Sequence, residues 1–221
     1  VIMPNVTFVA PANAISYIGA EPLLIDIHGG NWQMDIDLLE ELLREDCIIS
    51  ADGSVYHRSS NKKISSILIV HVQGNICDMD RLLNLAKEFN LIVIEDAAEA
   101  IGSRYKDEYL GTIGDLGVLS FNGNKIITTG GGGAILTDDP ELAKRAKHLT
   151  TTAKTPHRWD YVHDEVGYNF RMPNLNATLG LAQLEKINEF LKAKRMLFKK
   201  YYNAFNKIKG ISLYKEPKNA R

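Results

Sequence analysis

The sequence has few of the features that mark several large classes of protein. It contains only two cysteines, Cys47 and Cys77, and neither belongs to a CxxC motif or to a cluster of cysteines and histidines. We therefore expect no disulfide framework and no zinc site. Two buried thiols are typical of a reducing compartment, which favours the cytoplasm. No apolar run approaches the roughly 20 residues of a membrane span.

An excess of one charge is also missing. The 26 basic and 27 acidic side chains leave a formal net charge of −1, and no zinc-finger, RRM or basic-zipper pattern occurs. Nucleic-acid binding is therefore not expected. The first residues have neither the basic start nor the cleavage site of a signal peptide. Both ends of the sequence are abrupt, which is typical of an internal piece of a longer protein.

The sequence does contain a regular alternation of β-branched apolar runs with helical patterns. This alternation is typical of βαβ units, so it predicts an α/β fold with a mostly parallel sheet flanked by helices. The expected strands are residues 5–10, 22–26, 65–72, 91–96, 116–121 and the run AILT near 134–137, and the expected helices are 11–18, 35–44, 78–90 and 140–149.

Two further segments complete this organisation. Residues 50–63 are polar and contain glycine and serine, which predicts a surface loop without chemistry. One long helical pattern runs from Leu175 to Phe205. We expect a large domain over residues 1–174 and, over 175–221, a connecting helix with the start of a smaller C-terminal domain.

Two expected strands end on residues that can carry chemistry, and ligands bind at such ends in open parallel sheets. In LIVIEDAAEA, Asp96 ends a buried strand. Its carboxylate can serve as a metal ligand, a ribose-binding group, the partner of a protonated ring nitrogen, or a helix N-cap for the amides of Ala98 or Glu99. Taken alone, the N-cap is favoured, and no neighbouring histidines or carboxylates support a metal site.

The other strand ends in VLSFNGNK. Ser120, Asn122 and Asn124 alternate along an expected extended segment that ends at Lys125. A hydroxyl and amides beside a lysine suit an anion and an amine that must be neutral to attack a carbonyl, although an ordinary surface lysine fits as well. Catalysis with pyridoxal 5'-phosphate (PLP) needs such an amine together with a carboxylate at the ring nitrogen. Lys125 and Asp96 lie on successive strands, so both can reach one crevice.

Four segments resemble, in the same order, the DegT/StrS family of sugar aminotransferases: TFVAPANAISYIGAEPLLIDI, IEDAAEAIGS, SFNGNKIITTGGGGAILTDD and VGYNFRMPNLNATLGLAQLE. GNK and TTGGGG are similar to the branch of legionaminic-acid pathways. The resemblance implies PLP fold type I, PLP as cofactor and a homodimer with shared active sites. It also implies transfer of an amino group from L-glutamate to the C4 ketone of a nucleotide-linked 4-keto-6-deoxy sugar, for bacterial surface amino sugars.

Position by position, the resemblance implies roles for the residues nearest the cofactor ring. Lys125 matches the lysine joined to PLP as a Schiff base, and Asp96 matches the carboxylate on the pyridine nitrogen. Phe8 matches the aromatic side chain stacked on the ring, with a plain core aromatic as the alternative. Another fold type I enzyme, such as a lyase or desulfurase, and a regulatory homologue without activity remain alternatives.

The resemblance also implies contacts farther from the ring. Ser120 matches the residue that binds the cofactor phosphate, and Asn169 matches the asparagine that reaches the phosphate from the neighbouring subunit. Glu99 stands near the cofactor where many members have His or Gln, and Asn122 replaces a frequent His. The family's own phosphate-binding turn precedes the segment at which this sequence begins.

Overall fold

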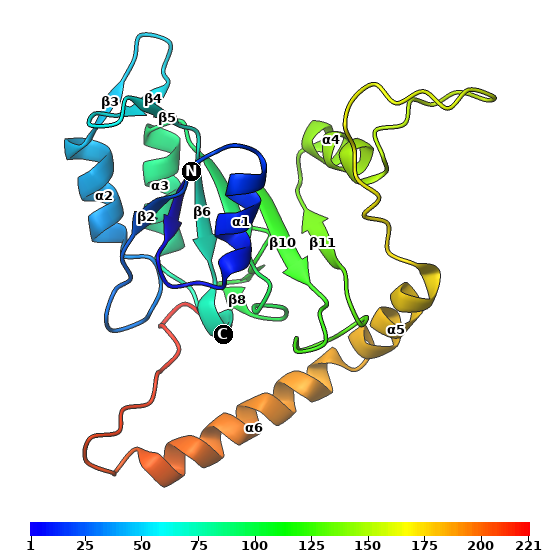
Figure 1. The fold of residues 1–221 in the computed structure, drawn as a ribbon. Helices are drawn as coiled ribbons and strands as arrows, with labels where there is room; N and C mark the ends of the chain where they lie inside the picture. The colour runs from blue at the N-terminus through cyan, green and yellow to red at the C-terminus, as the bar shows by residue number, and fades with distance from the viewer.

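The computed structural model describes residues 1–221, and its centre is a six-stranded sheet in the order β11-β10-β7-β6-β1-β2 (Figure 1). Neighbouring strands are parallel except for the antiparallel pair of β10 and β11. The α/β prediction with a mostly parallel sheet is therefore confirmed. The strands are β1 (Ile2–Pro4), β2 (Leu23–Ile25), β6 (Ser66–Val70), β7 (Ile92–Asp96), β10 (Leu116–Ser120) and β11 (Gly133–Leu136).

Helices cover the two faces of this sheet unequally. On one face, α2 (Ile36–Glu45) and α3 (Met79–Glu88) enclose a core cluster of 24 buried residues that includes Ile67 and Ile69 of β6. On the other face, α1 (Val9–Tyr17) packs through a small cluster that includes Leu68. Successive side chains of a strand point to opposite faces, which is why the continuous run ILIV of β6 supplies both clusters.

Two expectations for the first 64 residues are wrong. The strand expected at residues 5–10 is instead β1 (Ile2–Pro4), and Val9 already begins α1. Pro11 lies in the first turn of that helix, where a missing N–H is harmless. Residues 50–63 are not a plain loop, because β4 (Val55–His57) and β5 (Lys62–Ile64) form a three-stranded antiparallel sheet with β3 (Cys47–Ile49). Strands of three residues are too short to show a reliable alternation.

The chain after β11 is helical but loosely packed. It forms α4 (Pro140–Thr150), a long loop, α5 (Asn174–Leu184) and α6 (Ile187–Phe205), and Figure 1 shows α6 running below the ends of the strands. The single helix expected over 175–205 is wrong, because it is interrupted at Glu185 and Lys186. Neither residue is a helix breaker, so the pattern gave no sign of the interruption. None of the helices is both long and apolar enough to cross a membrane.

Candidate active site

The candidate site lies where three neighbouring parallel strands end together. Val70 of β6, Asp96 of β7 and Val118 of β10 are in register, so the chain leaves the sheet there in three adjacent segments. We call this side of the sheet the carboxyl edge. The segments are the 3-10 turn η1 (Val72–Gly74), the turns that follow Asp96, and the turn that follows Ser120. The prediction that Asp96 and Lys125 approach the same edge is therefore consistent with the strand order.

Glu99 joins all three segments. Its Oε1 lies 3.5 Å from the Nζ of Lys125, and its Oε2 accepts the backbone N–H of Gln73 at 2.8 Å. Gln73 has a φ of 55°, a conformation that is uncommon outside glycine and concentrates at functional sites. The side chain of Lys125 is only 17% exposed. The amine is thus held at the carboxyl edge by a carboxylate whose own position is fixed.

Asp96 is half-buried and points toward the same region. Its Oδ1 accepts the N–H of Ala98 at 3.0 Å. Burial raises the pKa of the Asp96 carboxyl, against the opposing effects of the Ala98 N–H and of nearby His71 and Lys125. The contact with Ala98 was anticipated, but the helix N-cap is wrong, because turns and not a helix follow Asp96.

Phe8 precedes α1 and is 78% exposed. The alternative that it is a core aromatic is therefore wrong, and a large aromatic face is open to a ligand at the end of β1. Ser120 is the last residue of β10, and its Oγ accepts the N–H of Asn122 at 3.4 Å. Both residues follow or end strands on the carboxyl edge, although neither side chain forms a hydrogen bond with Lys125.

The segment after Ser120 differs from the expected extended run. It forms a turn in which the N–H of Lys125 donates to the carbonyl oxygen of Asn122 at 3.0 Å. Asn122 and Asn124 are exposed and share a side-chain hydrogen bond of 3.4 Å. Glycine and asparagine favour turns because they tolerate tight backbone conformations, and this local preference prevails over the alternation. Lys125 therefore reaches Glu99 from a turn, not from a strand.

Asn169 lies apart from these residues. It sits in the long loop between α4 and α5, where it forms an isolated antiparallel bridge with Thr151, and its side chain is exposed. Within a single chain it is therefore not part of the cluster at the carboxyl edge. Its expected contact with the cofactor phosphate would have to be made in another subunit.

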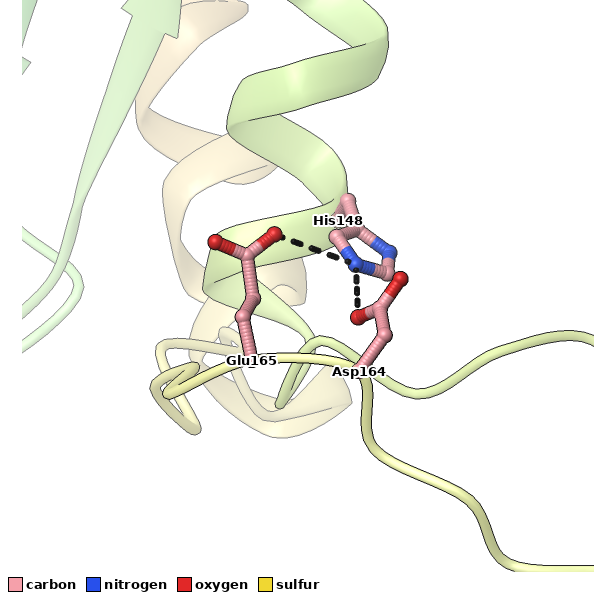
Figure 2. Close-up of side chains that lie close together, drawn as sticks. All are labelled: His148, Asp164 and Glu165. Carbon is pink, nitrogen blue, oxygen red and sulfur yellow. Dashed lines mark hydrogen bonds and ion pairs between the residues drawn. The ribbon is translucent and has the colours of Figure 1, made fainter.

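A second group of polar side chains lies in the same loop region, and no pattern in the sequence indicated it. The Nε2 of His148 lies 2.8 Å from Asp164 Oδ1 and 3.5 Å from Glu165 Oε1 (Figure 2). These residue types can bind a metal ion. However, both Glu165 oxygens also pair with the guanidinium of Arg145, which supplies the positive charge. We interpret the group as an ion-pair cluster that fastens the loop to α4.

Comparison with known proteins identifies the family of this chain. The sequence profile of the DegT/DnrJ/EryC1/StrS aminotransferase family matches residues 1–221. The chain belongs to this family. The GDP-perosamine synthase of Escherichia coli O157:H7 is 40% identical over 219 residues, which are 99% of this chain and 55% of the relative.

Two further members of the family extend the comparison. A Campylobacter jejuni protein named UDP-4-amino-4,6-dideoxy-N-acetyl-beta-L-altrosamine transaminase is 33% identical over 216 residues, 97% of this chain and 54% of the relative. The PLP form of Spr1654, a proposed sugar aminotransferase from Streptococcus pneumoniae, matches with a TM-score of 0.83 at 27% identity, covering 99% of this chain and 56% of that one. This chain thus spans about half the length of its relatives.

Proposed function

We propose that the protein is a PLP-dependent sugar aminotransferase. The observation that carries the proposal is the meeting of an amine, Lys125, with two carboxylates, Asp96 and Glu99, at one edge of a parallel sheet in a chain of this family. The amino donor would be L-glutamate, and the acceptor would be the C4 ketone of a nucleotide-linked 4-keto-6-deoxy sugar. Relatives named for GDP- and UDP-linked sugars support the nucleotide-linked substrate class.

The groups at the carboxyl edge fit the cofactor. Oδ1 of Asp96 is engaged by Ala98, which leaves Oδ2 for a further donor. Burial raises the pKa of this carboxyl, so Asp96 is a carboxylate whose desolvation is not fully compensated, and a protonated ring nitrogen would compensate it. Lys125 would hold the cofactor covalently, the exposed ring of Phe8 would stack on it, and Ser120 would bind its phosphate.

The proposed catalytic work of the chain is proton transfer and charge control. When bound, PLP supplies a ring that accepts the electron pair left behind as a proton leaves the donor's α-carbon. Lys125 would take that proton and, in the second half of the reaction, deliver a proton to C4 of the sugar. Glu99 would hold the ammonium form of Lys125 between these transfers, since its Oε1 lies 3.5 Å from Nζ. Asn122 would lie at the rim of the site.

We also propose a homodimer with shared active sites, working in the cytoplasm. Asn169 is exposed and remote from the carboxyl edge of its own chain, so it would serve the cofactor phosphate of a second copy. The loop and helix around it expose large apolar side chains that a second copy would cover, namely Trp159, Tyr161, Val166, Phe170 and Leu175.

The structure disfavours the desulfurase alternative. A desulfurase needs a mobile, nucleophilic cysteine, and the thiolate is the nucleophilic form. Both thiols are buried, and burial raises the pKa of Cys77 to about 12. Neither cysteine lies in the turns that surround Lys125.

Borohydride reduction of the PLP-loaded protein tests the proposal. We expect the wild type to gain one cofactor, covalently attached to the peptide that contains Lys125. Lys125→Ala should gain none, and Lys106→Ala should behave like the wild type, because Lys106 pairs with Asp80 outside the site. Cofactor trapped equally by Lys125→Ala would refute the assignment, and a wild type that stays colourless with PLP would favour a regulatory homologue.

The substrates need a separate measurement. We expect L-glutamate to bleach the yellow protein, and nucleotide-linked 4-keto sugars to restore the colour in the second half-reaction. A protein that releases a product from an amino acid without consuming any keto sugar would be another kind of PLP enzyme.

A further inference from the structure

The strand ends at the site contain a buried polar pair that the proposed reaction does not use. His71, which follows β6, is 1% exposed, and Glu95 in β7 is 0% exposed. Burying an ionisable group costs stability unless partners satisfy it. The contacts of this pair therefore indicate what it contributes.

Glu95 makes as many hydrogen bonds as a carboxylate can accept. Its Oε1 accepts the backbone N–H groups of Ile113 and Gly114, each at 2.6 Å. Its Oε2 accepts the N–H of Gly111 at 2.9 Å and lies 2.7 Å from the Nε2 of His71. A carboxylate offers about four acceptor sites, and all of them are used here. One side chain thus ties the end of β6 and the turn before β10 to β7.

These contacts define the protonation of the pair. Burial raises the pKa of the Glu95 carboxyl, but the hydrogen bond and charge of His71 and the N–H groups of Gly114 and Gly111 outweigh it, so the pKa is lowered. An ionised Glu95 can only accept hydrogen bonds, so Nε2 of His71 must carry a proton and donate it. The pair is therefore a charge-assisted bond inside the sheet.

Asp96 is the next residue of the same strand and depends on the same histidine. The backbone N–H of His71 donates to the carbonyl oxygen of Asp96 at 3.0 Å. Successive side chains of a strand point to opposite faces, so Glu95 points into the sheet's packed face and Asp96 points away from it. His71 also acts on the Asp96 carboxyl through space, because its electrostatic effect lowers the pKa of that carboxyl against the effect of burial.

We propose that His71 and Glu95 are a positioning pair that fixes the place of the Asp96 carboxylate and its electrostatic surroundings. Glu95 holds the strand end, and His71 links the carboxylate of Glu95 to the backbone of Asp96. The other charges that act on Asp96 are those of Lys125 and Glu99. The role of Asp96 at the cofactor ring nitrogen rests on the proposed function. The effect of His71 and Glu95 on the Asp96 carboxylate does not.

Substitutions at His71 separate the hydrogen bond from the electrostatic effect of the ring. His71→Gln offers an amide N–H in place of Nε2 but no ionisable ring, whereas His71→Leu removes both and leaves Glu95 short of a donor. His57→Gln is the matched control, because His57 bonds Ser60 in the small sheet of β3, β4 and β5. We expect His71→Leu to unfold at a lower urea concentration than either glutamine variant.

The first readout needs no cofactor. In cofactor-free protein, the ¹³C resonance of the Asp96 carboxyl, assigned with Asp96→Asn, reports its titration. We expect His71→Gln to raise the midpoint by about one pH unit, a roughly tenfold change in proton affinity, and His57→Gln to leave it unchanged. An unchanged midpoint in a folded His71→Gln protein would show that the pair serves packing alone, and would overturn the proposal.

The second readout connects the pair to the proposed function. We expect His71→Gln to weaken PLP binding about tenfold, as judged by titration with the cofactor, and His57→Gln to leave it unchanged. If wild-type protein binds no PLP while the Asp96 midpoint still shifts in His71→Gln, the positioning pair stands and the aminotransferase proposal fails. Equal PLP affinities for wild type and His71→Gln would show that the positioning pair does not contribute to cofactor binding.

Discussion

The chain divides into two parts that are stabilised in different ways. Every buried apolar side chain except Ala153 lies before Leu136, and α6 contains no buried residue at all. Residues 1–136 therefore form a fold with its own hydrophobic core, whereas residues 137–221 follow that core without building another. In the two helices that follow the long loop, many large apolar side chains are exposed and the others are half-buried.

Polar contacts help to fasten the second part to the first. The side-chain amide of Gln183 in α5 donates to the carbonyl oxygen of Thr128 at 2.6 Å and accepts its N–H at 3.0 Å. At the end of the chain, Arg104 and Arg221 exchange two backbone hydrogen bonds. Such contacts contribute about 1 kcal/mol each, so the second part should respond weakly to mutation unless a partner covers it.

Truncation of one leucine in each part gives the largest expected difference. Leu82 of α3 is 0% exposed, and Leu197 of α6 is 48% exposed. Leu82→Ala should lower the free energy of unfolding by about 3 kcal/mol, because it removes buried methyl groups and leaves a cavity. Leu197→Ala should change it by less than about 0.5 kcal/mol. Urea unfolding of both variants checks this, and equal losses would show that α6 packs as tightly as α3.

A pair of glycines tests how tightly the first part is packed. A Cβ at Gly117 in β10 would lie 1.9 Å from the carbonyl oxygen of Gly111, whereas a Cβ at Gly29 would meet nothing within 4 Å. Gly117→Ala should therefore cost about 2 kcal/mol or more through displaced backbone. Gly29→Ala should be neutral or slightly stabilising, because it restricts the unfolded chain. Thermal unfolding distinguishes them, and a stable Gly117→Ala protein would mean that the turn at Gly111 moves easily.

The same division decided what could be predicted from the sequence. In the first part, apolar runs such as ILIV and LIVI predicted the places of β6 and β7. Asp78 is the N-cap of α3, as is typical of an acidic residue that precedes a helical pattern. Burial on both faces leaves a clear pattern in a strand. In the second part, Gly180 is the only buried residue of the last two helices, so the interruption at Glu185 and Lys186 left no trace in the pattern.

The sequence predicted which strand ends form the candidate site, but not the contacts between its side chains. Asp96 and Lys125 were predicted to reach one crevice because parallel strands end at a common edge, and this order is fixed by hydrophobic burial. The contact of Glu99 with Gln73, by contrast, depends on the positive φ of Gln73 in η1. A glutamine in the sequence does not indicate such a backbone conformation. The bond between His71 and Glu95 joins residues 24 positions apart, and only the folded sheet brings them together.

Removal of the amide contact between the parts should have a smaller effect. Gln183→Ala leaves the backbone N–H and carbonyl of Thr128 without their side-chain partner, so it should cost about 1 kcal/mol. Asn203→Ala on exposed α6 is the control and should be neutral. Hydrogen exchange at the Thr128 amide should speed up only in Gln183→Ala. Unchanged exchange there would mean that α5 is held by other contacts.

The ion-pair cluster of the long loop should give the smallest effect on overall stability. The hydrogen bond from His148 lowers the pKa of Asp164, and that from Arg145 lowers the pKa of Glu165. A lowered folded pKa means that the contribution is present above the ordinary values of 3.8 and 4.5 and is lost as the pH falls through the lower folded values. The loop should therefore loosen only in acid.

Arg145→Gln reproduces this loosening at neutral pH. The variant should leave the midpoint of global unfolding unchanged, because the cluster is exposed to solvent and screened by it. It should, however, speed up hydrogen exchange at the Tyr168 amide, which donates to the carbonyl oxygen of Leu149 at 2.7 Å. Lys144→Gln is the matched control, since Lys144 lies 3.9 Å from Glu141 and has no contact with the loop. Equal exchange in both variants would show that backbone bonds alone hold the loop, and that the second part of the chain needs no ion pairs to present Asn169.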